Sequence, residues 1–160
     1  MSVAGVRRDG AFPDLALRDI EGGSHSAAEA WSKGEALFLV GHRNCKTTRE
    51  TLPYFDRIHR RSSEGRGVRL VLQDDAETAR ALVAAMGLAV PVRLEPDPYP
   101  LAESLNVVTV PTIFLVDRSG KIAHVVEAFN RAELETLAAR MGVEGPLFAA
   151  ADKAPAFKPG

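Results

Sequence analysis

The chain has 160 residues, of which 46% are hydrophobic and 26% are charged, and its formal net charge is -1. This composition predicts one soluble globular domain with a core of its own and excludes an extensively disordered chain. Because acidic and basic residues are interspersed, no overall charge attracts the protein to nucleic acid or to an anionic membrane.

The sequence contains a single cysteine, Cys45. A disulfide within the chain is therefore impossible, and any disulfide must join this residue to a partner protein or to a small thiol. Residues 1–9 show no apolar run after their charges, and no later segment reaches the roughly 18–20 apolar residues of a membrane helix. We therefore expect a cytosolic protein without a membrane or nucleic-acid partner, although the mature form of an exported precursor would have the same features.

The first 90 residues predict strands that alternate with helices. The first strand alternates apolar and polar residues. Residues 36–40 are a continuous apolar run typical of a strand that helices cover on both faces, and residues 68–72 form a second buried strand. The helix after the second strand has apolar residues at helical spacing and Pro53 inside it as a kink. The predicted strands are residues 11–20, 36–40 and 68–72, and a helix follows each, beginning at Ser24 or Ser26, at Lys46 and at Asp74–Asp75.

The rest of the ordered chain predicts a short strand, a brief helix, a β-hairpin and a closing helix. The two hairpin strands are recognised by their separation and by the Asp-Arg-Ser-Gly turn between them. The closing helix has Asn130 as its N-cap and buries an apolar stripe. The short strand covers residues 91–94 and the brief helix residues 101–105. The hairpin strands are residues 111–116 and 121–128. The apolar stripe of the closing helix consists of Leu134, Leu137, Ala138 and Met141.

This element order predicts an α/β fold in which a central mixed β-sheet is flanked by helices on both faces. We divide the chain into an N-terminal leader (1–10), a domain (11–142) and a C-terminal tail (143–160). The tail contains proline and alanine without any periodicity, so we expect an extended arm or a disordered segment.

Cys45 lies where the apolar strand 36–40 turns into the helix beginning at Lys46. Free N–H groups and the positive end of the helix dipole favour a thiolate at such a position, and the neighbouring Arg43, Lys46 and Arg49 add positive charge. Thr48, one helical turn later, either donates a hydrogen bond to the sulfur or is simply a helix-start residue. The alternative to a reactive thiolate is the relic of a redox site or an inert, half-buried thiol.

Four segments in this order resemble the thioredoxin-fold superfamily, and within it the TlpA-like and redoxin branch. They match the opening strand, the strand and kinked helix around the active site, the cis-proline strand with its hairpin, and the closing helix. The segments are residues 12–22, 37–53, 110–120 and 130–141. The resemblance therefore implies a thioredoxin-like fold over residues 11–142.

In that family a Cys-x-x-Cys pair begins the helix, and the resemblance places Cys45 at the first, nucleophilic cysteine and Thr48 at the second. Asn44 stands where the family usually has tryptophan. The resemblance also implies that Val110 offers its backbone groups to an extended partner and that Pro111 is cis, facing Cys45. Because release of a mixed disulfide needs a second thiol, Thr48 argues against the ordinary dithiol reductase activity.

Other possible sites in the sequence lack the residues that their chemistry requires. His42 and Cys45 are spaced as a His-x-x-Cys pair, but two ligands do not make a metal site, so we expect neither a metal nor a cofactor. The Cys-Gly-Phe-Ser motif of monothiol glutaredoxins, which share an iron–sulfur cluster, is absent, as is the peroxiredoxin signature. A Cys-x-x-Thr pattern occurs in glutathione peroxidases, but their glutamine and tryptophan partners are not evident.

The basic residues at 57–61 end a helix and indicate solvated surface.

The sequence thus predicts a thiol oxidoreductase in which Cys45 attacks a disulfide or a peroxide and an external thiol resolves the product. Thr48 would stabilise the sulfur, and Asn44, Val110 and Pro111 would contact the partner, a thiol- or disulfide-containing protein or a small thiol. The alternative is a binding module or chaperone-like subunit that keeps the groove without turnover. The oligomeric state is left open.

Overall fold

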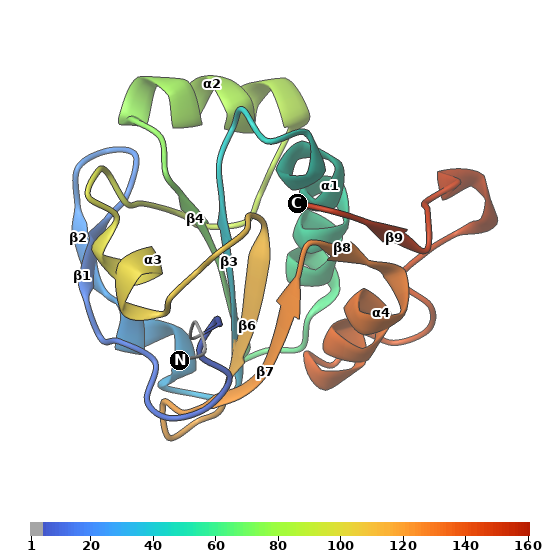
Figure 1. The fold of residues 1–160 in the computed structure, drawn as a ribbon. Coiled ribbons are helices and arrows are strands. Elements are labelled where there is room, and N and C mark those ends of the chain that lie inside the picture. Colours follow the sequence, from blue (N-terminus) through green and yellow to red (C-terminus); the bar gives the residue numbers. More distant parts are fainter. Residues whose placement is uncertain (1–4) are drawn as a thin grey trace.

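The computed structural model describes residues 5–160, whose centre is a seven-stranded mixed β-sheet with helices on both faces (Figure 1). The strand order is β2-β1-β5-β4-β3-β6-β7, and the predicted α/β class is confirmed. The strands are β1 (Ala16–Arg18), β2 (Ser24–Ser26), β3 (Ala36–Gly41), β4 (Gly67–Leu72), β5 (Val92–Leu94), β6 (Thr112–Val116) and β7 (Ile122–Glu127), with β8 (Phe129–Asn130) and β9 (Phe157–Lys158) in a separate two-stranded sheet. The helices are η1 (Ala27–Trp31), α1 (Lys46–Arg61), α2 (Ala76–Met86), α3 (Pro100–Ser104), α4 (Arg131–Arg140) and η2 (Ala150–Asp152).

β3 is the central strand, parallel to β4 on one side and antiparallel to β6 on the other. Because side chains alternate along a strand, Leu37 and Leu39 enter the core beneath α1, α2 and α4. Phe38 and Val40 enter the opposite core, which η1 and α3 cover. All six residues of β3 are buried, so the loop that follows β3 is held by a rigid strand.

Helix starts follow the capping residues in the sequence. Asp75 accepts a hydrogen bond from the backbone N–H of Thr78 at the start of α2, and Asn130 accepts one from that of Glu133 at the start of α4. Gly87 ends α2 in the left-handed conformation, with φ 62°. Among residues 5–160, no helix combines the length and the apolar character that a membrane span requires.

Two predicted elements differ in the structure. The strand expected over residues 11–20 is regular only from Ala16 to Arg18, because Ala11 bridges to Lys121 and Phe12 donates its N–H to Gly120, at the β6–β7 turn. Ser24 belongs to β2, an unpredicted strand, and the η1 cap is Ser26.

The segment 143–160 packs on the domain, contrary to the expected extended or disordered arm. Leu147 and Phe148 are buried in the core beneath α1 and α4. Arg57 on α1 forms a bidentate ion pair with Asp152, and β9 pairs antiparallel with β8. In the proposed leader, Val6 is buried, and residues 1–4 lie outside the described part. The domain boundaries themselves stay a prediction.

Candidate functional site

Cys45 is the N-cap of α1, directly after the loop that leaves β3. Its Sγ accepts a hydrogen bond from the backbone N–H of Thr48 at 3.4 Å, and the residue is half-buried. An N-cap acceptor of this kind is stabilised more when it is negatively charged, because it faces the positive end of the helix dipole. The position therefore suits a thiolate that solvent can still reach.

The loop before Cys45 is fixed by His42, a role that the sequence reasoning missed. The carbonyl of His42 accepts from the backbone N–H of Cys45 at 3.1 Å, and its ring Nδ1 accepts from that of Asn44 at 3.0 Å. The backbone N–H of Arg43 donates to Asp74 Oδ2 at 3.0 Å, which ties the loop to the segment before α2. Asn44 is exposed at the tip of the loop, where a partner can reach it.

Val110 and Pro111 lie across from Cys45, and the peptide bond between them is cis. The Sγ–H group of Cys45 donates to the carbonyl oxygen of Val110 at 3.4 Å. Segments 65 residues apart in the sequence are thus brought into contact, as the resemblance implies. The sulfur has one neighbour that favours the thiolate, the N–H of Thr48, and one that favours the neutral thiol, the carbonyl of Val110.

Thr48 contacts the sulfur through its backbone and not through its hydroxyl group. Its side chain is completely buried, and its Oγ1 has no hydrogen-bond partner among the described residues. The side chain turns toward β3 instead, where a Cβ added at Gly41 would lie 2.7 Å from Thr48 Cγ2. The expected hydrogen bond from the hydroxyl to the sulfur is therefore not formed, because the first helical turn directs this side chain inward.

The basic residues near Cys45 are engaged elsewhere. Arg49 Nη1 donates to the carbonyl of Arg43 at 2.5 Å, and Lys46 Nζ lies 3.8 Å from Glu50 Oε1. Within residues 5–160 the sulfur makes hydrogen bonds to Thr48 and Val110 only, so the start of α1 supplies the local stabilisation of a thiolate. No group of three or more His, Cys, Asp or Glu side chains in the described chain is placed to hold a metal ion.

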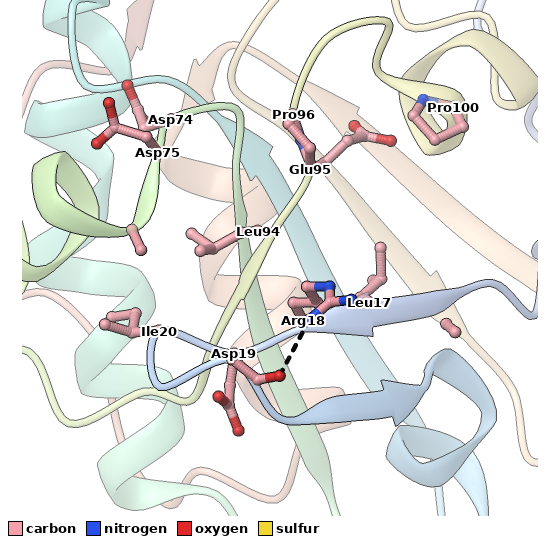
Figure 2. Close-up of a pocket in the computed structure, with 13 residues that line it drawn as sticks. Leu17, Arg18, Asp19, Ile20, Asp74, Asp75, Leu94, Glu95, Pro96 and Pro100 are labelled. Atoms are coloured by element: carbon pink, nitrogen blue, oxygen red, sulfur yellow. Dashed lines mark hydrogen bonds between the residues drawn. The ribbon is translucent and has the colours of Figure 1, made fainter.

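A pocket of about 420 Å³ lies between the β1–β2 turn, the start of α2 and the segment from Leu94 to Pro100 (Figure 2). Glu95 at its edge is 1% exposed and accepts hydrogen bonds from the backbone N–H groups of Leu101 and Ala102. Burial raises the pKa of the Glu95 carboxyl group. The pocket adjoins the loop before Cys45 through Asp74, which also accepts the hydrogen bond from the backbone N–H of Arg43.

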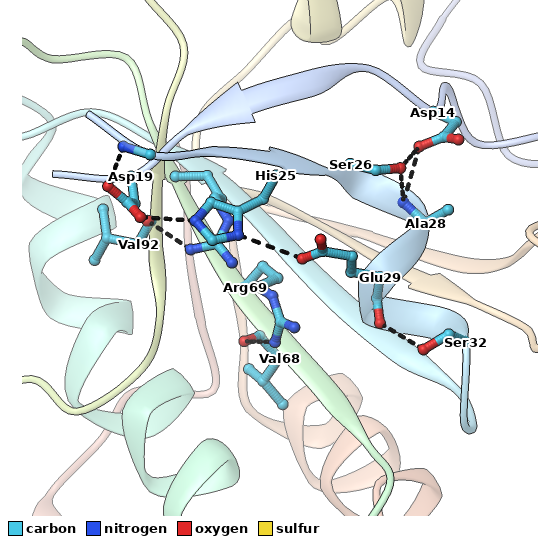
Figure 3. Close-up of polar contacts among 12 residues, drawn as sticks. Asp14, Asp19, His25, Ser26, Ala28, Glu29, Ser32, Val68, Arg69 and Val92 are labelled. Carbon is cyan, nitrogen blue, oxygen red and sulfur yellow. Dashed lines mark hydrogen bonds and ion pairs between the residues drawn. The ribbon is translucent and has the colours of Figure 1, made fainter. Parts of the chain in front are cut away.

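A network of polar side chains lies on the β1–β2 side of the sheet (Figure 3). His25 Nε2 lies 2.7 Å from Asp19 Oδ2, and its Nδ1 lies 3.4 Å from Glu29 Oε2. The hydrogen bond from His25 is the largest cause of the lowered pKa of Asp19. Because both ring nitrogens of His25 face carboxylates, this histidine joins β2 to its neighbours and is separate from Cys45.

Comparison with known proteins gives a family and a fold. The model of the AhpC/TSA family matches residues 9–125, which include Cys45, Val110 and Pro111. No curated protein sequence matches the chain.

Similar solved structures share the fold at low sequence identity. The thioredoxin domain of a thiol-disulfide oxidoreductase from Bacteroides vulgatus has a TM-score of 0.73 at 21% identity, over 89% of this chain and 100% of that one. A thiol-disulfide oxidoreductase from Bacteroides fragilis has a TM-score of 0.66 at 18% identity, covering 72% and 89%. A secreted disulfide oxidoreductase from Mycobacterium tuberculosis has a TM-score of 0.67 at 13% identity, covering 81% and 95%. The fold around Cys45 is therefore thioredoxin-like.

Proposed function

Because the chain belongs to the AhpC/TSA family, we propose that it is a thiol oxidoreductase whose chemistry is carried by Cys45 alone. The observation that carries the proposal is the position of Sγ in half-buried Cys45, at the N-cap of α1 and opposite the Val110–Pro111 bond. The similar solved structures include thiol-disulfide oxidoreductases, which supports a disulfide as the substrate.

In the proposed reaction the Cys45 thiolate attacks one sulfur of a partner disulfide. A bond forms between Cys45 and that sulfur, the partner's S–S bond breaks, and the second partner sulfur leaves as a thiolate that takes up a proton. An external thiolate then attacks the mixed disulfide and releases Cys45 as a thiolate, while its own sulfur becomes bonded to the partner. The external thiol is needed because Thr48 occupies the position from which a second cysteine would act.

Val110 would both hold the partner and activate the sulfur. A backbone N–H of an extended partner that donates to the Val110 carbonyl takes this acceptor away from the Cys45 thiol, which favours loss of the thiol proton. Pro111 has no N–H to compete for the thiolate. Asn44, exposed in the loop directly before Cys45, would contact the same partner, and the Thr48 N–H would stabilise the thiolate through the backbone.

The test is the reaction of the intact protein with oxidised glutathione at pH 7, followed by mass spectrometry of the glutathione adduct. We expect Cys45 to react at least about tenfold faster than free cysteine. The Cys45→Ser variant should give no adduct. A rate no higher than that of free cysteine would contradict the proposal. If the Cys45→Ser variant still binds the same partner proteins, the binding-module alternative gains support.

Peroxide is the second candidate substrate, favoured by the absence of a second cysteine, because formation of a sulfenic acid needs one sulfur only. The Cys45 thiolate would take one peroxide oxygen to become a sulfenate, and the other oxygen would leave as an alcohol or water after protonation. A thiol would then displace water from the sulfenic acid. Trapping of the sulfenic acid with dimedone after addition of hydrogen peroxide tests this reaction.

The partners that we propose are proteins with thiols or disulfides and small thiols. The cytosolic location stays a prediction from the sequence.

A further inference from the structure

The last residues of the chain run across the candidate site. β9 adds antiparallel to β8, with Phe129 opposite Lys158 and Asn130 opposite Phe157. In Figure 1 β9 extends from the side of α4 toward α1, and the chain ends beside α1. Residues 157–160 thus form an extended segment next to the helix that begins at Cys45.

Three contacts fix this segment at the start of α1 and at the cis-proline loop. Thr47, two residues after Cys45, donates its hydroxyl hydrogen to the carbonyl of Pro159. Lys158 Nζ lies 2.6 Å from a carboxylate oxygen of Glu50. Gly160 packs so closely on the cis-proline loop that a Cβ added to it would overlap Thr109 Oγ1 and the carbonyl oxygen of Val110.

Gly160 therefore abuts the same oxygen that accepts the hydrogen bond from Cys45. Sγ lies 3.4 Å from this oxygen, and a Cβ added at residue 160 would also contact it. The sulfur and the end of the segment therefore meet at the same carbonyl oxygen. An extended partner that uses the backbone of Val110 would have to enter the space that Gly160 takes up. The two cannot be bound together.

We propose that residues 157–160 occupy the partner groove of this protein as an internal mimic of its substrate. The inference rests on the proposed function, since it concerns the partner of the same site. It defines that partner as an extended protein segment with a lysine or arginine at the position of Lys158, facing Glu50. The tail competes with this partner and must leave before Cys45 can react with it.

A chain ending at Pro155 loses the β8–β9 pairing and the hydrogen bond from the Arg131 N–H to the Ala156 carbonyl, but it keeps the anchors of segment 143–160 in the core. Leu147 and Phe148 remain in the core, and Asp152 keeps its bond to Arg57. A chain ending at Pro155 should expose Cys45 to iodoacetamide and raise the alkylation rate at least about fivefold, because the groove-open population increases. In the full-length chain, Lys158→Glu should give an intermediate increase through repulsion by Glu50. Equal rates in all three proteins would overturn the proposal.

A second measurement separates this inference from the proposed function. The Cys45→Ser chain ending at Pro155 has no thiol, so its binding to a labelled peptide of residues 153–160 depends on the groove alone. We expect the peptide to bind this protein at least about tenfold more tightly than full-length Cys45→Ser, in which the attached tail competes at a high effective concentration. Equal binding would overturn the inference even if Cys45 reacts with disulfides. Preferential binding with an unreactive Cys45 would leave the inference standing and refute the proposed function.

Discussion

At the scale of single residues, Cys45 is set between two opposed hydrogen bonds. The N–H of Thr48 donates to Sγ, and the carbonyl of Val110 accepts from the thiol. Nearby cations do not bind the sulfur in the described chain. The ionisation of the thiol therefore depends on the N–H groups at the start of α1 and on whether another donor binds the carbonyl oxygen of Val110. Thr48 contributes a buried hydroxyl group without a partner among residues 5–160, which is costly in a protein interior.

Replacement of this threonine should create a dithiol site. In a helix, residues three apart have Cα atoms about 5–6 Å apart, within the range of disulfides. In Thr48→Cys we therefore expect the introduced thiol to form a disulfide with Cys45 after treatment with oxidised glutathione, seen as loss of both free thiols by mass spectrometry. The variant should also reduce insulin disulfides with dithiothreitol as donor, unlike the parent. Thr48→Ser is the control and should form no internal disulfide; two free thiols in oxidised Thr48→Cys would contradict the geometry.

At the scale of the elements, α1 is held in place by a buried carboxylate near its middle. Asp56 is 6% exposed, and its Oδ1 accepts from the backbone N–H groups of Ala89 and Val90, both at 2.8 Å. Its Oδ2 accepts from Arg60 Nε at 2.7 Å. One side chain thus fixes the helix that carries Cys45 to the connection between α2 and β5.

Removal of this carboxylate should destabilise the whole domain. Asp56→Ala leaves the two N–H groups of Ala89 and Val90 without their acceptor, so we expect the free energy of unfolding to fall by about 2–4 kcal/mol. Asp56→Asn keeps an acceptor oxygen and should lose about 1 kcal/mol, the contribution of the half-exposed ion pair with Arg60. Urea denaturation measures both. Equal losses in the two variants would show that the N–H groups are not the important partners.

The connection from β5 to α3 contains a group that makes stability depend on pH. Burial raises the pKa of Glu95 above its ordinary value of 4.5, so the folded state binds its proton more tightly than the unfolded state does. This contribution to stability is complete below pH 4.5 and is lost as pH rises through the folded-state pKa. Glu95→Gln removes the titration, so the unfolding free energy of the parent relative to this variant should fall as pH rises from 4.5 toward neutrality. Exposed Glu77→Gln is the control, and parallel pH profiles for the parent and Glu95→Gln would contradict the assignment.

At the scale of the whole molecule, the segment after α4 is part of the core and also reaches the site. The ring of Phe148 lies 4.5 Å from that of Tyr54 on α1, and the guanidinium group of Arg131 lies 4.9 Å from it. Glu135 on α4 accepts from the backbone N–H groups of Leu147 and Phe148. These contacts position the chain so that β9 meets β8.

Truncation of Phe148 should therefore cost as much as truncation of a core residue. Phe148 is 6% exposed, and we expect Phe148→Ala to lower the free energy of unfolding by about 3–4 kcal/mol. Phe157, which is 58% exposed in β9, is the matched control, and Phe157→Ala should change the value by less than about 0.5 kcal/mol. Urea unfolding curves compare the two. A small loss in Phe148→Ala would mean that the segment contributes little to the core.

Much of the fold could be predicted because local signals and burial agree. The apolar run 36–40 became the central strand, and the caps Asp75 and Asn130 start their helices where the sequence indicates. The short strands β2 and β8 could not be predicted, since two or three residues have no periodicity and are defined only by their pairing partners. The packing of 143–160 was missed for a related reason: isolated apolar residues become buried only when a distant surface receives them.

The sequence by itself determined that one thiol begins a helix after a buried strand, because cap position and hydrophobic periodicity are local properties of the chain. Only the tertiary structure decided what surrounds that thiol. Hydrogen bonds and packing between residues far apart in the chain turned the Thr48 hydroxyl away from the sulfur, set the Val110 carbonyl against it and laid residues 157–160 across the groove. Such contacts depend on how the sheet orders its strands, which short-range sequence patterns do not specify.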